Sequence, residues 1–182
     1  MPDDAHEDLL EIAKRIAIEA GEAVLTVYDK GEFDAYQKED DSPVTSADYL
    51  ANDIITKQLS EATPDIPILS EENKHASLEE RKDWSRYWLI DPIDGTQEFI
   101  ARSGDFAVNI ALIENNEPKI GVIFWPPGQS LYYAEKGKGA FKSSPDGDHP
   151  ISVRQLDDPK NSVVMIAISR RQSREKVLGR MC

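Results

Sequence analysis

The sequence predicts a layered α/β or α+β domain, because segments with helical periodicity come first and strand-like segments mostly follow. From Leu9 to Tyr28 the apolar residues recur at helical spacing, and a second apolar helical face follows Thr45. After Tyr87 come mainly short apolar runs, separated by turn signals of the Asn-Asn, Pro-Pro-Gly and Gly-Lys-Gly type. The 182 residues suffice for a domain of ordinary size.

The first helix is expected to end near Gly31, and the second to begin where Thr45 or Ser46 can cap its free N–H groups. Between them the chain is polar and carries the charged run Lys38–Asp41. A loop or a short hairpin is therefore expected there, and a solvated turn explains the charges most simply.

The apolar runs predict the strands of the domain. They are Ile66–Ser70, Tyr87–Ile90, Phe106–Ile113, Ile120–Trp125, Leu131–Tyr133 and Val163–Ile168. The second of these is expected to stop at Asp91-Pro92, and short helices are expected at Thr96–Ala101 and Ser173–Leu178. The aromatic residues in the strand-like runs, Trp88, Trp125, Tyr132 and Tyr133, are predicted to lie in the core.

The bulk composition excludes some classes of function. A net charge of -13 argues against binding of nucleic acid backbones but not of a small phosphorylated substrate, since acidic residues that hold cations create a positive site. The single cysteine, Cys182, permits no disulfide within the chain. No apolar run reaches the roughly 18 residues of a transmembrane helix, and no signal peptide is visible, so a cytoplasmic location is expected.

The most informative stretch is Asp91-Pro92-Ile93-Asp94-Gly95-Thr96. Two carboxylates three residues apart at the end of a buried strand repel each other unless cations lie between them. A fixed proline and a flexible glycine can aim Asp91, the Ile93 carbonyl and Asp94 at one point. Hard oxygen ligands of this kind suit Mg²⁺.

A second acidic pair, Glu71-Glu72, follows another predicted strand. Acidic pairs from two strand ends can build a two-metal site that activates water for the hydrolysis of a phosphate ester. A Thr96 hydroxyl bonded to a carboxylate, for which Asp48 is the candidate, can orient that water. Gly95 and Thr96 can also offer backbone N–H groups to a phosphate.

Each of these features also has a simpler interpretation. Asp94-Gly95 is a common turn signal, and Glu71-Glu72 can be a solvated pair. Asp48 can serve only to favour the start of its helix through charge.

Several segments together resemble the inositol-monophosphatase superfamily and, within it, the CysQ-type 3'(2'),5'-bisphosphate nucleotidases. The signature is Trp88-Leu89-Ile90 followed by Asp91–Thr96 and Glu98-Phe99. Upstream, Leu69-Ser70-Glu71-Glu72 and the segment Asp41–Asp48 match further motifs, and Asp105–Ile113 is CysQ-like. The resemblance covers about residues 9–169.

The resemblance implies an αβαβα sugar-phosphatase-like fold and two or three Mg²⁺ ions per site. It implies metal binding by Glu71, Asp91, the Ile93 carbonyl and Asp94, and catalytic roles for Asp48, Thr96 and Glu72. The substrate phosphate would contact Glu71 and Ile93 to Thr96. The reaction it implies removes the 3'-phosphate of adenosine 3',5'-bisphosphate to give AMP, in sulfur metabolism, with inhibition by lithium and calcium.

The chain departs from the family pattern mainly in length. Members resembling it continue for roughly another 80 residues, through a Trp-Asp-x-Ala-Gly motif that this sequence lacks after Ser169. We therefore expect an N-terminal metal-binding domain over residues 1–160, the start of a truncated second domain over residues 161–182, and impaired activity. Gln97 stands where CysQ-type enzymes often carry Lys, and Ser169–Gln172 matches its family element only in part.

Two alternatives to the nucleotidase remain open at this point. The chain can be a phosphatase of inositol phosphates or sugar phosphates, or a non-catalytic metal-binding fragment that pairs with a partner through exposed apolar surface. A homo-oligomer and peripheral association with the inner membrane face are compatible with each.

Overall fold

The computed structural model describes residues 8–38, 41–73, 76–144 and 146–155. The chain divides into two compact units, Met1–Ile151 and Ser152–Cys182. Of the second unit only residues 152–155 are described, and these are exposed and form no helix or strand. The strand predicted at Val163–Ile168, the helix predicted at Ser173–Leu178, the segment Ser169–Gln172 and Cys182 lie outside the described residues.

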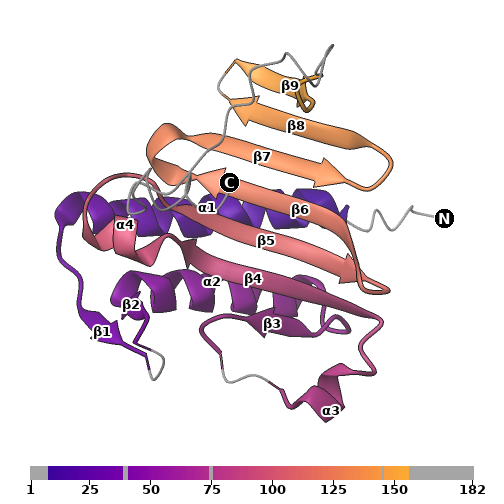
Figure 1. The fold of residues 1–182 in the computed structure, drawn as a ribbon, viewed down its shortest axis with the longest axis horizontal. Helices are drawn as coiled ribbons and strands as arrows, with labels where there is room; N and C mark the ends of the chain where they lie inside the picture. The colour runs from indigo at the N-terminus through magenta and orange to yellow at the C-terminus, as the bar shows by residue number, and fades with distance from the viewer. Residues whose placement is uncertain (1–7, 39–40, 74–75, 145, 156–182) are drawn as a thin grey trace, which may run out of the picture. The chain divides into compact units, whose positions relative to one another are not determined.

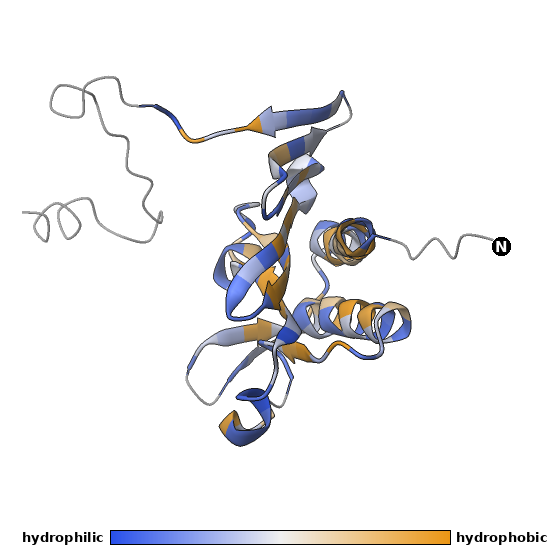
Figure 2. Cartoon of the chain, turned by 90° about the vertical axis from the view of Figure 1, so that its right-hand side faces the viewer, coloured by the Kyte–Doolittle hydropathy of each residue, from blue (hydrophilic) through white to orange (hydrophobic). Residues whose placement is uncertain are grey.

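Two long helices lie on one face of a seven-stranded sheet (Figures 1 and 2). The mixed α/β class predicted for the sequence is thus confirmed. The order of elements is α1 (Leu9–Lys30), β1 (Ala35–Gln37), β2 (Pro43–Thr45), α2 (Ser46–Ala62), β3 (Ile68–Ser70), α3 (Leu78–Arg81), β4 (Arg86–Asp94), α4 (Thr96–Ile100), β5 (Ala107–Glu114), β6 (Glu117–Trp125), η1 (Pro126–Gly128), β7 (Ser130–Glu135), β8 (Gly139–Ser144) and β9 (Gly147–Ile151).

The first helix ends at Gly31 and the second begins after Thr45, as the sequence predicts. The Asp8 side chain accepts a hydrogen bond from Leu10 N at the start of α1, and Gly31 ends this helix with a φ of 70°. Thr45 caps α2. The buried stripe of α1 lies against β5, β6 and β7. At Gly21 the helix lies so close to β6 that an added Cβ would be 2.3 Å from the Phe124 ring.

The sheet has the strand order β3-β4-β5-β6-β7-β8-β9. Only the β3–β4 pair is parallel, and the other pairs are antiparallel. A crossover that contains α3 connects β3 to β4. Because the two strands are parallel, their carboxyl ends lie at the same edge of the sheet. The β1–β2 pair forms the short hairpin that was one of the two expectations for residues 32–44.

The core lies between the helices and the sheet. It contains Trp88, Phe99, Ile16, Ile55, Ile110, Val122 and their neighbours. Trp88 is fully buried as predicted, and its indole N–H donates to the Thr63 hydroxyl over 3.0 Å. The core prediction is wrong for Trp125, which is 40% exposed, and Tyr132 and Tyr133 are only half-buried.

Candidate active site

Asp48 and Thr96 are joined across the two layers of the fold. One carboxylate oxygen of Asp48 accepts from the Thr45 backbone N–H at 2.8 Å and from the Thr45 hydroxyl at 2.5 Å, which completes the cap of α2. The other oxygen accepts from the Thr96 hydroxyl at 3.0 Å. The helix-start interpretation of Asp48 and the interpretation as partner of Thr96 are therefore both correct, one for each oxygen.

The burial of Asp48 is complete, and this raises the pKa of its carboxyl group, while the hydrogen bonds from Thr45 and Thr96 act in the opposite direction. The Thr96 hydroxyl also lies 3.1 Å from the Ile93 carbonyl oxygen, so its one hydrogen has two acceptors. Its oxygen keeps lone pairs that can accept a hydrogen from a water molecule.

Strand β4 continues through the motif rather than stopping at Asp91-Pro92 as predicted. The register with β5 explains the difference. Asp91 lies opposite Asn109 and Asp94 opposite Ala107, so β4 takes three steps where β5 takes two. Residues three apart on a regular strand face opposite sides, and the extra residue of this bulge returns Asp94 to the face of Asp91.

The neighbouring strand adds a residue that sequence reasoning did not assign to the site. The Asn109 amide nitrogen donates to Asp94 Oδ2 over 3.1 Å, while the Asn109 side-chain oxygen is buried without a hydrogen-bond partner among the described residues. The available signal was an asparagine within the apolar run of β5.

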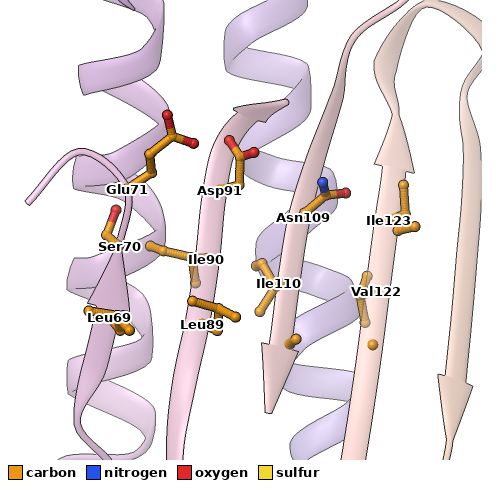
Figure 3. Close-up of a pocket in the computed structure, with 12 residues that line it drawn as sticks. Leu69, Ser70, Glu71, Leu89, Ile90, Asp91, Asn109, Ile110, Val122 and Ile123 are labelled. Carbon is orange, nitrogen blue, oxygen red and sulfur yellow. The ribbon is translucent and has the colours of Figure 1, made fainter. Parts of the chain in front are cut away.

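Glu71 lies beside Asp91 because of the parallel pairing of β3 and β4. Ser70 pairs with Ile90, and the Glu71 backbone N–H donates to the Ile90 carbonyl over 3.2 Å. Figure 3 shows the carboxylates of Glu71 and Asp91 at the ends of these two strands, with Asn109 on the next strand. The prediction that separate acidic stretches come together is thus supported by the register.

Lys38 contacts both glutamates of the acidic pair. Its ammonium nitrogen lies 2.7 Å from Glu72 Oε1 and 3.0 Å from Glu71 Oε1. The expected solvated turn is therefore wrong for Lys38, whose side chain is only 22% exposed. The solvated-pair interpretation is also wrong for Glu72, with 5% of its side chain exposed, whereas Glu71 is 53% exposed.

The pKa of Glu72 is raised by burial, and the contacts with Lys38 oppose that rise. Burial alone would lower the pKa of Lys38, but the hydrogen bonds to Glu72 and Glu71 outweigh it and the pKa is raised. Lys38 thus supplies a positive charge at the acidic end of the sheet.

Asp91 lies among several other carboxylates of the cluster. Burial and the charges of Glu71, Asp94, Glu72 and Asp48 raise the pKa of its carboxyl group to about 7. Crowding of this kind is relieved when a divalent cation binds between the carboxylates.

The donor set fits Mg²⁺ in chemistry, since it consists of Glu71, Asp91, Asp94 and the Ile93 carbonyl, all oxygen ligands. With the side chains as they stand, no group of three or more His, Cys, Asp or Glu within the described ranges has the spacing of a metal site. Glu71 and Asp94 instead bind Lys38 and Asn109. Binding an ion would therefore require these two side chains to exchange partners.

Gly95 shapes the turn between Asp94 and Thr96. Its φ is 96°, and a Cβ at this position would lie 2.7 Å from the Asp105 carbonyl oxygen. Both facts require glycine. Helix α4 follows at once but has only five residues, so the suggested phosphate binding by backbone N–H groups of Gly95 and Thr96 stays a prediction.

The open face of the sheet carries a cavity that begins at the acidic cluster. It has a volume of about 540 Å³ and is mainly apolar. Glu71, Asp91 and Asn109 line one end, and the rest is lined by Leu69, Ser70, Leu89, Ile90, Ile110, Ala111, Gly121, Val122 and Ile123.

Residues 5–180 match the model of the inositol monophosphatase family. The chain belongs to the inositol monophosphatase family. Within it, the chain is 46% identical over 163 residues to the 3'(2'),5'-bisphosphate nucleotidase CysQ of Salmonella typhimurium, covering 89% of this chain and 63% of the relative. It is 42% identical to the CysQ nucleotidase of Aggregatibacter actinomycetemcomitans, covering 94% and 61% of the two chains.

The crystal structure of CysQ from Bacteroides thetaiotaomicron superimposes with a TM-score of 0.69 at 36% identity, over 82% of this chain and 59% of that one. The family resemblance noted in the sequence is confirmed. The chain spans about six-tenths of the length of these curated relatives. Along the described residues, no helix is long and apolar enough to cross a bilayer.

Proposed function

We propose that this chain is the metal-binding and water-orienting part of a phosphomonoesterase that converts adenosine 3',5'-bisphosphate to AMP and inorganic phosphate. The observation that supports it most directly is the hydrogen bond between Thr96 and the buried carboxylate of Asp48, next to the carboxylates of β3 and β4. The similarity to CysQ nucleotidases supports the choice of substrate.

Glu71, Asp91, Asp94 and the Ile93 carbonyl would hold Mg²⁺, in line with the oxygen donors and with the crowding that raises the pKa of Asp91 to about 7. Bound Mg²⁺ would supply positive charge that lowers the pKa of a water molecule and neutralises phosphate oxygens.

The Thr96 oxygen accepts a hydrogen bond from the attacking water and so orients it, because the Thr96 hydroxyl hydrogen is donated towards Asp48. The water oxygen then forms a bond to phosphorus, and the bond from phosphorus to the ribose 3'-oxygen breaks in line with it. The proton that the attacking water loses ends on the 3'-oxygen, which leaves as the hydroxyl of AMP. Gly95 and Thr96 would contact the phosphate, and Glu72 would act through water, as the family resemblance implies.

The test is phosphate release by the purified 182-residue chain with Mg²⁺, measured side by side on adenosine 3',5'-bisphosphate and inositol 1-phosphate. We expect the nucleotide to react faster, lithium to inhibit, and the rate to be low for a chain that spans only part of its relatives' length. Faster release from inositol 1-phosphate would replace this proposal with an inositol-phosphate phosphatase.

A non-catalytic metal-binding role is the second candidate, and the exposed apolar side chains on the open sheet face, Leu89 and Ile123, favour it. It predicts that Mg²⁺ raises the melting temperature while the wild type releases phosphate no faster than a variant in which alanine replaces Thr96. Light scattering on the same sample would show whether the chain associates through this face.

A further inference from the structure

Among the described residues, Trp125 is the exposed aromatic side chain of the seven-stranded sheet. It ends β6 and is 40% exposed, and Ile123, two residues earlier on the same strand, is 48% exposed. Residues two apart on a strand share a face, and Figure 3 shows Ile123 beside Asn109 on the face that carries Asp91. Trp125 therefore belongs to the face of the acidic cluster.

The strand register places Trp125 close to Asp94. Asp94 lies opposite Ala107 on β5. Val108 pairs with Phe124, so Ala107 and Trp125 are the next opposed residues at that end of the ladder. The backbones of Asp94 and Trp125 thus lie two strand spacings apart, about 10 Å.

The indole ring is held in one orientation by its surroundings. Its N–H donates to the Gly104 carbonyl over 2.8 Å. Gly128 packs against the ring, since a Cβ there would lie 2.0 Å from a ring carbon. One edge and one face are therefore occupied, and the exposed area belongs to the rest of the ring. A rigid aromatic surface binds a planar partner with little loss of conformational entropy.

We propose that Trp125 stacks against the purine base of the substrate while the 3'-phosphate lies at Asp94, Gly95 and Thr96. The inference rests on the proposed function for the position of the phosphate. A nucleoside 3'-phosphate carries its base several ångströms from the phosphorus, which matches the separation across β5. Stacking on an aromatic ring is favourable for every base, so Trp125 selects for a base-bearing substrate over a small phosphate ester.

A purely structural role of Trp125 makes a different prediction. The loop that contains Gly104 follows α4, and its Asp105 carbonyl oxygen packs against Gly95. A residue that only fixes this loop would therefore change the hydrolysis rate of every phosphate ester to the same extent. Phenylalanine keeps a stacking ring and loses the N–H, whereas alanine loses both. The pair W125F and W125A therefore separates stacking from loop support.

The experiment measures kcat and KM of the 182-residue wild type, W125F and W125A on adenosine 3',5'-bisphosphate and on glycerol 2-phosphate, which has no base. We expect W125A to raise KM for the nucleotide by about five- to a hundredfold, with kcat and the glycerol 2-phosphate kinetics within about twofold of wild type. W125F should stay within about threefold on both substrates. Equal losses on both substrates in both variants would assign Trp125 to loop support and overturn the proposal.

A second readout does not depend on turnover. Binding of AMP with Mg²⁺ should quench tryptophan fluorescence in the wild type, and W125F should lose that change although Trp84 and Trp88 remain. Quenching without phosphate release from either substrate would support base stacking on Trp125 and contradict the proposed function. Phosphate release without quenching, or quenching that persists in W125F, would contradict base stacking on Trp125 and leave the proposed function supported.

Discussion

The Thr96 hydroxyl lies 3.0 Å from the Asp48 carboxylate, although 48 positions separate the two residues in the sequence. The contact connects the start of α2 with the first residue of α4, which follows the end of β4. Asp48 is fully buried and Thr96 is half-buried. Removing Asp48 would also remove part of the cap of α2, so Thr96 is the partner whose loss should affect chemistry more than folding.

Replacement of Thr96 by alanine removes the oxygen that would orient the attacking water. We expect T96A to lower kcat by about 10²- to 10⁴-fold, as for other lost proton-transfer and orienting groups. T96S keeps the hydroxyl and should retain most of the activity. T26A, which removes an exposed hydroxyl on α1, is the matched control and should change neither rate nor stability. A normal kcat in T96A would exclude the water-orienting role.

Asp91 should make the metal-free protein sensitive to pH. Its pKa is raised from the ordinary value to about 7, so the fold favours the neutral carboxyl group. The stabilisation from this group is complete below the ordinary pKa and is lost as the pH rises through about 7. We expect the free energy of unfolding without metal to fall by on the order of 1–2 kcal/mol between pH 5 and pH 8.

Chemical denaturation at several pH values with EDTA measures this slope. D91N should flatten it, because an amide does not titrate, and Mg²⁺ should restore stability at pH 8 in the wild type but much less in D91N. D53N, on the exposed side of α2, should keep the wild-type slope. A slope unchanged by D91N would assign the pH dependence to other groups.

Lys38 should stabilise the acidic cluster when no metal is bound. K38M leaves Glu72 buried without its counterion, and we expect a loss of about 1–3 kcal/mol in EDTA, less than for a fully buried pair because Glu71 is half exposed. Mg²⁺ should recover most of that loss, since a cation can replace the ammonium group.

The control is K82M, which breaks an exposed ion pair with Glu79 and should stay within about 0.5 kcal/mol of wild type. Thermal unfolding with and without Mg²⁺ on both variants gives the comparison. A K38M protein as stable as K82M in EDTA would show that the cluster tolerates its charges without Lys38.

Gly95 should not tolerate a side chain. G95A combines a left-handed backbone conformation with a contact of 2.7 Å to the Asp105 carbonyl oxygen, and we expect a loss of about 2–4 kcal/mol together with a fall in kcat. G137A is the matched control, because its φ is 86° but nothing lies within 4 Å of the added Cβ. It should cost about 1 kcal/mol and leave kcat unchanged. Equal losses in both variants would show that the Asp105 contact relaxes freely.

Helix positions were predictable because the signals are local. The periodicity of α1, the cap at Thr45 and the glycine at position 31 each act within a few residues. Strands β8 and β9 were not predicted, because neither the mostly half-buried β8 nor the exposed edge strand β9 shows an apolar alternation in its sequence. The continuation of β4 through Asp94 depends on pairing with β5, which no local pattern reveals.

The candidate site was predictable in part for the same reason. The acidic residues follow strands, and their motifs match a known family, so Glu71, Asp91 and Asp94 could be named from the sequence. Lys38 and Asn109 could not, because their contacts join segments 33 and 15 positions away. Trp125 was expected in the core because an apolar run does not show which face of the strand is covered.

The parallel pairing of β3 with β4 makes the site intolerant of small changes in chain length. Loss of one residue between Arg86 and Ile90 would turn the carboxylate of Asp91 towards the helices and leave Glu71 beside an apolar neighbour. Insertions within residues 76–85, which are mostly exposed, carry no such penalty, because they lie upstream of the register. Homologous chains should therefore vary in the number of residues between 76 and 85, and keep the number of residues from the start of β4 to Thr96 unchanged.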